Sequence, residues 1–311
     1  MATGADMTVT SPTPPGPLER RYRRMLLAYP RGYRAGHGEE LIATLLATAE
    51  PHRSTPPLTE TVALLAGGLR TRAVQAAQGP AWADAVHLAI TALAVANVAM
   101  LLPYAGTIPL WTGLAVFTAV AVARRRFWLA LPAAALTSVK VAAIGLGLPW
   151  LDDTLLPVFA DPLPREWGVP ALLSTGGPAA PATAHALVFL GAAVLAVRRA
   201  APRARSWRWT LAVPLLIGVN TDMRALTDPT ATPGRTALEI GLLLLAVWAG
   251  HVAADPRWAL AALLCLPVEV VELAENIGTA TRGDYAHLAL LVFLTSAAAT
   301  AAHRASRHAL L

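Results

Sequence analysis

The sequence predicts an all-α, polytopic membrane protein with about eight transmembrane helices, preceded by a small cytoplasmic N-terminal helical prefix. Hydrophobic residues make up 55% of the 311 residues, charged residues only 14%, and the mean hydropathy is +0.50. A soluble domain cannot bury so large a share of apolar side chains. From Trp82 onward the apolar residues form runs near the ~20 residues that a membrane-crossing helix needs, and arginines gather at the ends of these runs.

The first seventeen residues, MATGADMTVTSPTPPGP, are polar and rich in proline. They lack the apolar core of a secretory signal, so residues 1–17 are predicted to be a disordered leader. Cys265 is the only cysteine, which excludes a disulfide framework and a cysteine metal cluster. The chain is basic, with a pI of about 10.2. Its arginines follow the ends of apolar runs, which is typical of membrane topology and not of a nucleic-acid surface.

Residues 18–79 are predicted to form a more soluble unit of three amphipathic helices. In each helix the apolar residues recur at helical spacing and form a stripe along one face. Arginines lie between the residues of the first stripe and follow the end of the third. The stripes are Leu18, Tyr22, Met25 and Tyr29; then Leu41, Ile42, Leu45 and Leu46; then Leu58, Val62, Leu65 and Leu69. Such helices either form a small bundle or lie on the membrane with their arginines toward anionic lipid.

The stretch YPRGYRAGHGEE, residues 29–40, combines tyrosines, arginines, a histidine and two carboxylates. His37 and the two glutamates have poor spacing for metal ligands on one helix face. The glycines have no preceding strand and no following Gly-Lys-Ser/Thr, so a phosphate loop is not favoured. We interpret the stretch as the corner of a helical hairpin, with Pro30 in the first turn of the second helix and Glu39 and Glu40 paired with arginines of the first.

The segment RRMLLAYPRGYRAGHGEELIATLL resembles the short helical prefix that precedes the membrane domain in permease-like proteins and in many uncharacterised actinobacterial integral membrane proteins. LTETVALLAGGLRTR is similar to the third helix that is often present after it, so the resemblance covers about residues 18–75. It implies a cytoplasmic prefix of regulatory or assembly type and carries no catalytic residues. The chain departs from the permeases, because it has no large extracytoplasmic domain and more spans. The candidate interaction residues of the prefix are Tyr29, Pro30, Tyr33, Arg34, Glu39, Glu40 and Leu41.

Residues 80–304 are predicted to be the transmembrane domain and residues 305–311 a cytoplasmic tail. The predicted spans are residues 82–102, 107–123, 127–149, 183–197, 207–221, 236–254, 258–277 and 286–303. With both termini in the cytoplasm, eleven arginines flank the inner ends of these spans and four flank the outer ends. This positive-inside asymmetry favours an even number of spans in the cell membrane.

The seventh span, which contains LPVEVVELAENIG, places carboxylates within the membrane. Glu269, Glu272 and Asn276 share one helix face, because they are three and four residues apart. Charged side chains are costly in hydrocarbon and face a bundle interior, a partner or water. Other polar residues are expected at the same outer level. The candidate intramembrane polar cluster is Lys140, His185, Glu239, Glu269, Glu272, Glu275 and Asn276.

Two interpretations of this cluster compete. In the functional one, the residues line an outward-opening cavity that binds a cation, a proton or a polar headgroup. In the structural one, Lys140 is neutralised by one glutamate, while Glu275 and Asn276 already lie at the membrane interface. Lys140 and Glu272 lie at similar depths in their spans, which makes such a pair plausible.

The chain contains no catalytic motif of a recognised kind. It has no Gly-x-Ser-x-Gly elbow and no His-Glu-x-x-His, so we expect no enzyme, no cofactor and no metal site. The segment 150–182 is either a lid or disordered, and disorder is favoured. The favoured function is a non-enzymatic signalling, regulatory or assembly component. The alternative is a transporter or channel that uses the carboxylate cluster. The expected partners are the lipid bilayer and a cytoplasmic protein that binds residues 18–75, with no nucleic acid.

Overall fold

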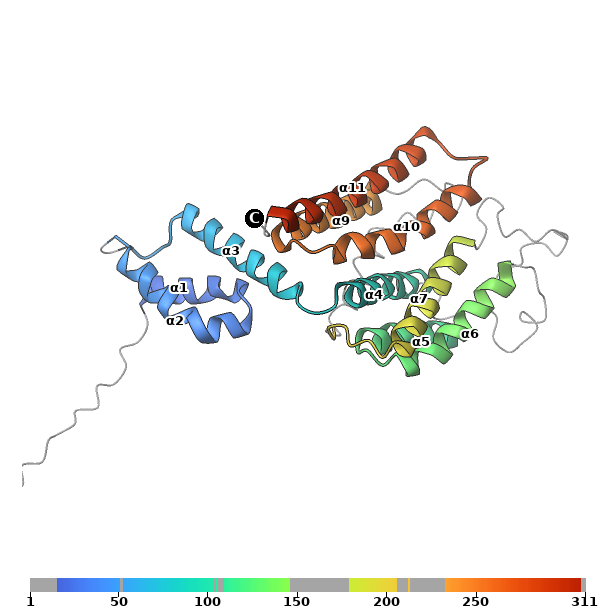
Figure 1. Ribbon diagram of the computed structural model, residues 1–311, viewed down its shortest axis with the longest axis horizontal. Helices are drawn as coiled ribbons and strands as arrows, with labels where there is room; N and C mark the ends of the chain where they lie inside the picture. The colour runs from blue at the N-terminus through green and yellow to red at the C-terminus, as the bar shows by residue number, and fades with distance from the viewer. Residues whose placement is uncertain are drawn as a thin grey trace, which may run out of the picture. The chain divides into compact units, whose positions relative to one another are not determined.

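The computed structural model describes residues 16–50, 53–102, 105, 109–145, 179–205, 212 and 233–308. Within these ranges the chain forms helices and no strand, as the all-α prediction requires. The chain divides into two compact units, Met1–Ala76 and Ala77–Leu311, where the sequence suggested a boundary at residue 79. Figure 1 shows the helices of both units. Most of the predicted leader and most of the segment 150–182 lie outside the described residues.

The described residues of the first unit form three α-helices and one short 3₁₀ turn. They are α1 (Pro17–Met25), η1 (Leu26–Ala28), α2 (Arg31–Ala47) and α3 (Leu58–Ala76). Proline at the start of α1 costs no hydrogen bond, because the first amide groups of a helix have no intrahelical acceptor. Tyr22 is 1% exposed and packs with Leu18 and Leu64 in the core of the unit. A second small core joins Leu26, Tyr29 and Ile42.

The face of α3 that packs is not the predicted one. Its predicted apolar stripe is exposed: Leu58 is 78%, Val62 57%, Leu65 41% and Leu69 54% accessible. The buried face carries Leu64, Gly68 and Ala73 instead. The physical reason is the close approach of two backbones, which only a small residue permits.

At Gly68 an added Cβ would lie 2.7 Å from the Cβ of Ala28 and 2.9 Å from its carbonyl carbon. Arg72, one turn later, donates hydrogen bonds to the carbonyls of Ala28 and Leu27, at 2.6 Å for the latter. These bonds satisfy carbonyl groups where the first helix ends. The close contact at Gly68 and the hydrogen bonds of Arg72 therefore determine which face of α3 packs.

The second unit contains seven described helices, all in regions where the sequence predicts spans. They are α4 (Ala81–Leu101), α5 (Pro109–Ala123), α6 (Phe127–Gly145), α7 (Ala179–Val197), α9 (Pro233–Ala253), α10 (Arg257–Glu275) and α11 (Arg282–His308). The predicted fifth span, residues 207–221, lies outside the described residues apart from position 212. Four helices are long and apolar enough to cross a membrane, namely α4, α7, α9 and α11.

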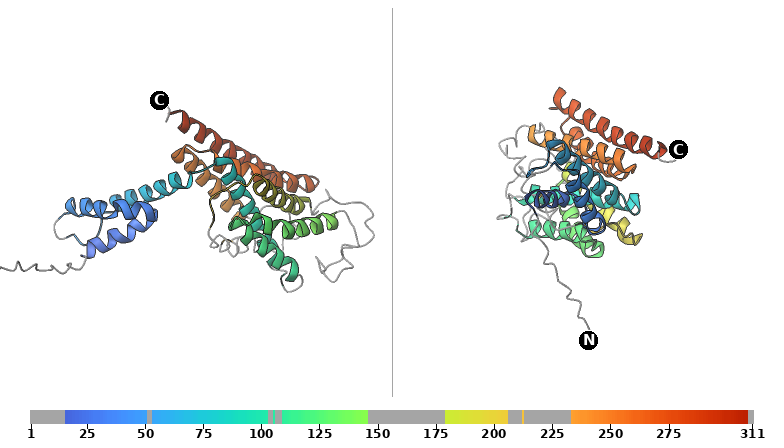
Figure 2. Two further views of the ribbon diagram at one scale, coloured as in Figure 1. Left: turned by 60° about the horizontal axis from the view of Figure 1, so that its bottom comes forward. Right: turned by 90° about the vertical axis from the view of Figure 1, so that its left-hand side faces the viewer.

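The helices of the second unit form two groups joined by α10. Helices α4, α5, α6 and α7 pack on one another, α9 packs along α11, and α10 contacts α4, α7, α9 and α11. Figures 1 and 2 show α10 between the two groups. Small residues allow close packing: an added Cβ at Gly191 would lie 2.4 Å from Ile90 Cγ2, and one at Gly250 would lie 3.2 Å from the carbonyl oxygen of Ala298. This is the packing that membrane helices favour.

One end of the second unit is held by a buried arginine. Arg257, at the start of α10, is 1% exposed. It donates to Asp84 Oδ2 at 2.8 Å and to Asp255 Oδ1 at 2.9 Å. It also donates to the carbonyls of the segment that leads into α4, residues 77–79. Asp84 also accepts the backbone N–H of Arg203 at 3.2 Å. These contacts bring together three junctions that are distant in the sequence, namely the entry to α4, the segment after α7 and the turn between α9 and α10.

Candidate functional site

Three carboxylates converge on one guanidinium. They meet where α9 begins and α10 ends, whereas Arg257 lies where α10 begins. Arg235, in the first turn of α9, donates from Nε to Glu239 Oε1 at 2.8 Å. Its Nη2 reaches both oxygens of Glu269 at 2.9 Å. Glu272 accepts from Nη1 at 3.0 Å and from Nη2 at 2.9 Å. We call Arg235, Glu239, Glu269, Glu272 and His287 the Arg235 cluster.

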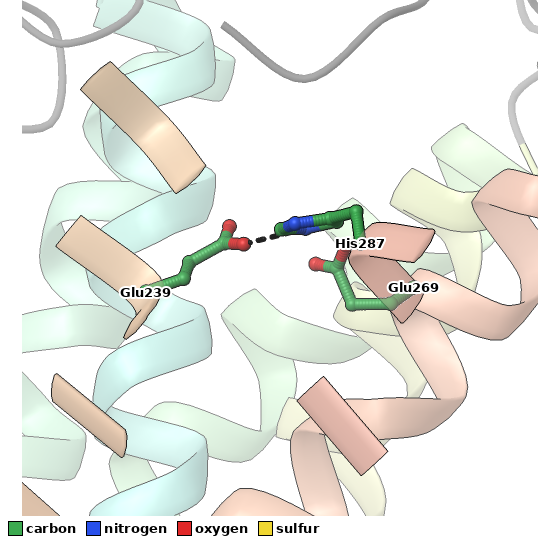
Figure 3. Close-up of side chains that lie close together, drawn as sticks. All are labelled: Glu239, Glu269 and His287. Atoms are coloured by element: carbon green, nitrogen blue, oxygen red, sulfur yellow. Dashed lines mark ion pairs between the residues drawn. The ribbon is translucent and has the colours of Figure 1, made fainter. Parts of the chain in front are cut away.

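His287, in the second turn of α11, completes the cluster. Its Nε2 lies 2.9 Å from Glu239 Oε2, and its side chain is 12% exposed. Figure 3 shows this contact, with Glu269 beside the imidazole ring. Within the described part of the chain, neither ring nitrogen of His287 has a partner with hydrogen-bond geometry, and neither does Glu239 Oε2. The two groups are close enough for an ion pair but do not meet hydrogen-bond geometry.

Four members of the cluster line an open pocket of about 40 Å³, namely Arg235, Glu269, Glu272 and His287. Leu273, Asn276, Asp284 and Leu288 contribute to the same pocket. Single oxygen and nitrogen atoms of Glu239, Glu269 and His287 lie within 4.8 Å of one another, which is close enough to hold one ion among them. The sequence predicted no metal site, and His287 was not among its candidate residues.

Local structure positions these side chains. Pro267 lies inside α10, two residues before Glu269. Because proline has no N–H, the carbonyl of Leu263 loses its helical hydrogen bond. The start of α11 is fixed by a capping box: Thr281 N and Oγ1 donate to Asp284 Oδ2 at 2.7 and 2.8 Å. The carboxylate of Asp284 therefore caps its own helix, although it also lines the pocket.

Four of the predicted polar residues lie outside the charged centre. Among the described residues, the cation that contacts Glu269 and Glu272 is Arg235, which the sequence analysis did not include in the cluster. Lys140 is 1% exposed and lies 5.9 Å from the ring centre of Trp111. Glu275 accepts the backbone N–H groups of Ala179 and Ala180 and so caps α7, at 3.0 Å for Ala180.

Asn276 ends α10, donating from Nδ2 to the carbonyl of Glu272 at 2.8 Å, and lines the pocket. His185 lies in α7 and lines a different, smaller cavity. The structure thus brings together Glu239, Glu269 and Glu272 of the predicted set and separates His185 and Lys140 from them.

Arg235 and His287 were missed from the sequence. Arg235 was interpreted only as a charge in an outer loop, although it stands four residues before Glu239, the spacing of an intrahelical ion pair. His287 is the second residue of the last predicted span and stands about one turn into α11. Its side chain could have been expected near Glu239, because α9 and α11 both begin at the same end of the unit.

The prefix candidates form the hairpin corner that the sequence suggested. Tyr29 is 8% exposed, and Tyr33 stacks between it and His37, with ring centres 5.1 and 4.8 Å apart. Arg23 of α1 pairs with Glu39 at 2.7 and 2.9 Å. Glu40 is exposed, and Pro30 is the N-cap of α2 rather than part of its first turn.

Arg34 and Leu41 are partly buried, Leu41 against both cores of the unit. The motif residues therefore pack α1 against α2. Most of the exposed large apolar side chains of the unit belong to α3, and Leu27 of η1 and Leu46 of α2 are exposed as well.

The chain matches no protein-family model, no curated protein sequence and no solved structure with which it was compared. A function for the Arg235 cluster therefore has to be inferred from its own residues and their geometry.

Proposed function

We propose that the protein is a multi-pass membrane protein of the transporter or channel class that takes up a proton or a small cation at the Arg235 cluster. The observation that carries this proposal is the convergence of three carboxylates on one guanidinium. The sequence placed this class second, behind a signalling or assembly role. The close approach of His287 to Glu239 without hydrogen-bond geometry now favours it.

The charges of the cluster do not balance. Among the described residues, Glu239, Glu269 and Glu272 carry three negative charges and Arg235 one positive charge. A protonated His287 would still leave one negative charge in excess. Surplus charge is expensive in a poorly hydrated place, so the cluster gains free energy by binding a proton or a cation.

Cation binding is tested by the thermal stability of the purified protein. Binding to the native state alone raises the midpoint of unfolding, by an amount that grows with the logarithm of the cation concentration. We expect a titration with Na⁺, K⁺, Mg²⁺ or Zn²⁺ to raise the midpoint of the wild type. Glu269→Gln should remove most of this dependence, because it deletes a carboxylate that faces both Arg235 and the pocket.

Glu40→Gln is the matched control, because Glu40 is exposed in the first unit. It should keep the wild-type response to cations. Uptake of protons and of the same cations into liposomes that contain the protein then separates transport from binding. The proposal would be contradicted if the stability of the wild type responded to cations and pH no more than that of Glu269→Gln.

A regulatory role of the prefix is the second candidate, favoured by the exposed stripe of Leu58, Val62, Leu65 and Leu69 on α3. The chemistry of the unit fits an anionic lipid surface. Residues 16–76 contain nine arginines and five glutamates, with no lysine or aspartate. Aliphatic side chains beside excess positive charge are what a helix needs to bind in the headgroup region.

This lipid contact is tested in the full chain. In a Cys265→Ser background, an environment-sensitive fluorophore on Leu65→Cys should report an apolar surrounding in nanodiscs of anionic lipid. The signal should weaken as salt rises, because salt screens the arginines. A fluorophore on Gly36→Cys, on α2, serves as control. An unchanged signal in neutral and anionic lipid would exclude lipid binding by this stripe.

For the topology we propose eight spans with both termini in the cytoplasm. The arginine bias of the sequence supports it. So does the gathering of arginines from several junctions around Asp84, at the end of the second unit where α4 begins.

A further inference from the structure

A small cavity lies inside the group of α4, α5, α6 and α7, apart from the Arg235 cluster. Each of these four helices contributes one polar side chain to its wall, and alanines and a valine complete it. The polar residues are Asn97 of α4, Thr118 of α5, Thr137 of α6 and His185 of α7. These four helices are apolar on all sides. Amphipathic patterning therefore does not explain why their polar side chains meet at one place.

The four polar side chains are almost fully buried. Asn97 is 8%, Thr118 5%, Thr137 3% and His185 7% exposed. Thr137 is satisfied locally, because its hydroxyl donates to the carbonyl of Ala133 at 3.0 Å. In the described part of the chain Thr118 Oγ1 has no hydrogen-bond partner. Asn97 and His185 line the same cavity.

Buried polar groups are almost always hydrogen-bonded, and ordered water supplies the bond where protein does not. The cavity has a volume of about 10 Å³, close to the ~10–15 Å³ that one water molecule requires. A buried water also needs two to four polar partners. The Asn97 amide, the Thr118 hydroxyl and the His185 imidazole supply three, including donors and acceptors.

We propose that this cavity binds one water molecule, held by Asn97, Thr118 and His185. The water joins α4, α5 and α7 at a level where their own contacts are apolar. It explains why a histidine stands in the apolar stretch of α7 without a charged partner among the described residues. The site is independent of the proposed cation uptake, since no residue is shared with the Arg235 cluster.

The direction in which one isosteric substitution changes the melting temperature tests the proposal. Thr118→Val keeps the shape of the side chain and removes its hydroxyl. If water is bound, it loses a partner, and the melting temperature of the full-length protein should fall by about 2–4 °C, as for the loss of one hydrogen bond. If the cavity is dry, the substitution removes an unpaired buried hydroxyl, and the melting temperature should rise. An unchanged or raised melting temperature would overturn the proposal.

Thr137→Val is the matched control, because its hydroxyl is already bonded to the backbone. The decrease in melting temperature must be larger for Thr118→Val than for this control. An equal decrease would reflect only the replacement of a threonine in a helix.

A spectroscopic measurement keeps the proposal testable if a variant fails to fold. In wild-type protein with ¹⁵N-labelled histidine, magnetisation transfer from water should reach the ring of His185 despite its burial. The resonance is assigned by its loss in His185→Gln. Absence of this transfer in the folded wild type would show a dry cavity and overturn the proposal.

Discussion

At the scale of single residues, Arg257 joins several segments of the second unit that are distant in the sequence. It is buried, and it bonds to Asp84, Asp255 and the carbonyls of residues 77–79. Arg257→Met should lower the stability of the protein by about 3–5 kcal/mol, because it leaves the buried Asp84 and the half-buried Asp255 without this partner. Thermal unfolding in detergent measures the loss.

Arg257→Met combined with Asp84→Asn should recover part of that stability, because the excess charge is then gone. Arg257→Lys should fall between wild type and Arg257→Met, since an ammonium group cannot make the forked contacts. Equal melting temperatures for Arg257→Met and wild type would contradict this role of Arg257 at the junction.

Tyr22 gives the first unit a dependence on alkaline pH. Its hydroxyl donates to Glu60 Oε2 at 2.7 Å. Burial and then the neighbouring carboxylate raise its pKa from 10.0 to about 12. The folded unit therefore holds this proton more tightly than the unfolded chain does. Its contribution to stability is complete below pH 10 and is lost as pH rises through about 12.

Ultraviolet absorbance of tyrosinate, followed together with helical circular dichroism, measures the alkaline transition. Tyr22→Phe should show no titration from this group, and its stability should depend less on pH in that range. Tyr29, whose pKa burial also raises, remains in the variant as an internal reference.

At the scale of helices, the approach of α3 to the first helix depends on Gly68. An added Cβ would lie 2.7 Å from Ala28 Cβ and 2.9 Å from a backbone carbon, so the backbones must separate. Gly68→Ala should therefore destabilise the first unit by about 1–3 kcal/mol, the range for overpacking. Gly36→Ala is the control: nothing lies within 4 Å of its added Cβ, and alanine should stabilise α2 by up to about 1 kcal/mol.

The same contact shows what sequence patterns could and could not predict. The long apolar helices were predictable because apolar length alone selects them, as the near-coincidence of residues 82–102 with α4 shows. The packing face of α3 could not be predicted in this way. Amphipathic patterns follow aliphatic side chains, whereas this contact is made by a glycine. The Arg235 cluster was predicted only in part, since partners of Glu269 from α9 and α11 are fixed by tertiary packing.

At the scale of the whole molecule, the proposed topology places the Arg257 end of the second unit in the cytoplasm and the Arg235 cluster toward the outside. In a Cys265→Ser background, Gly278→Cys should react in intact cells with a maleimide that cannot cross the membrane. His303→Cys should react only after the cells are opened. Both positions are exposed in the structure, so burial does not prevent labelling. Labelling of His303→Cys in intact cells would reverse the orientation.

The cap that Glu275 places on α7 has a consequence for fragments of the chain. Ala179 and Ala180, at the start of α7, are held by a side chain from the end of α10, and α7 packs on α4 and α6. These contacts act through space, so covalent continuity between α6 and α7 is not needed to place α7. A gene split at residue 160 should therefore yield two polypeptides that co-purify as one complex, and Glu275→Gln should weaken their reassembly.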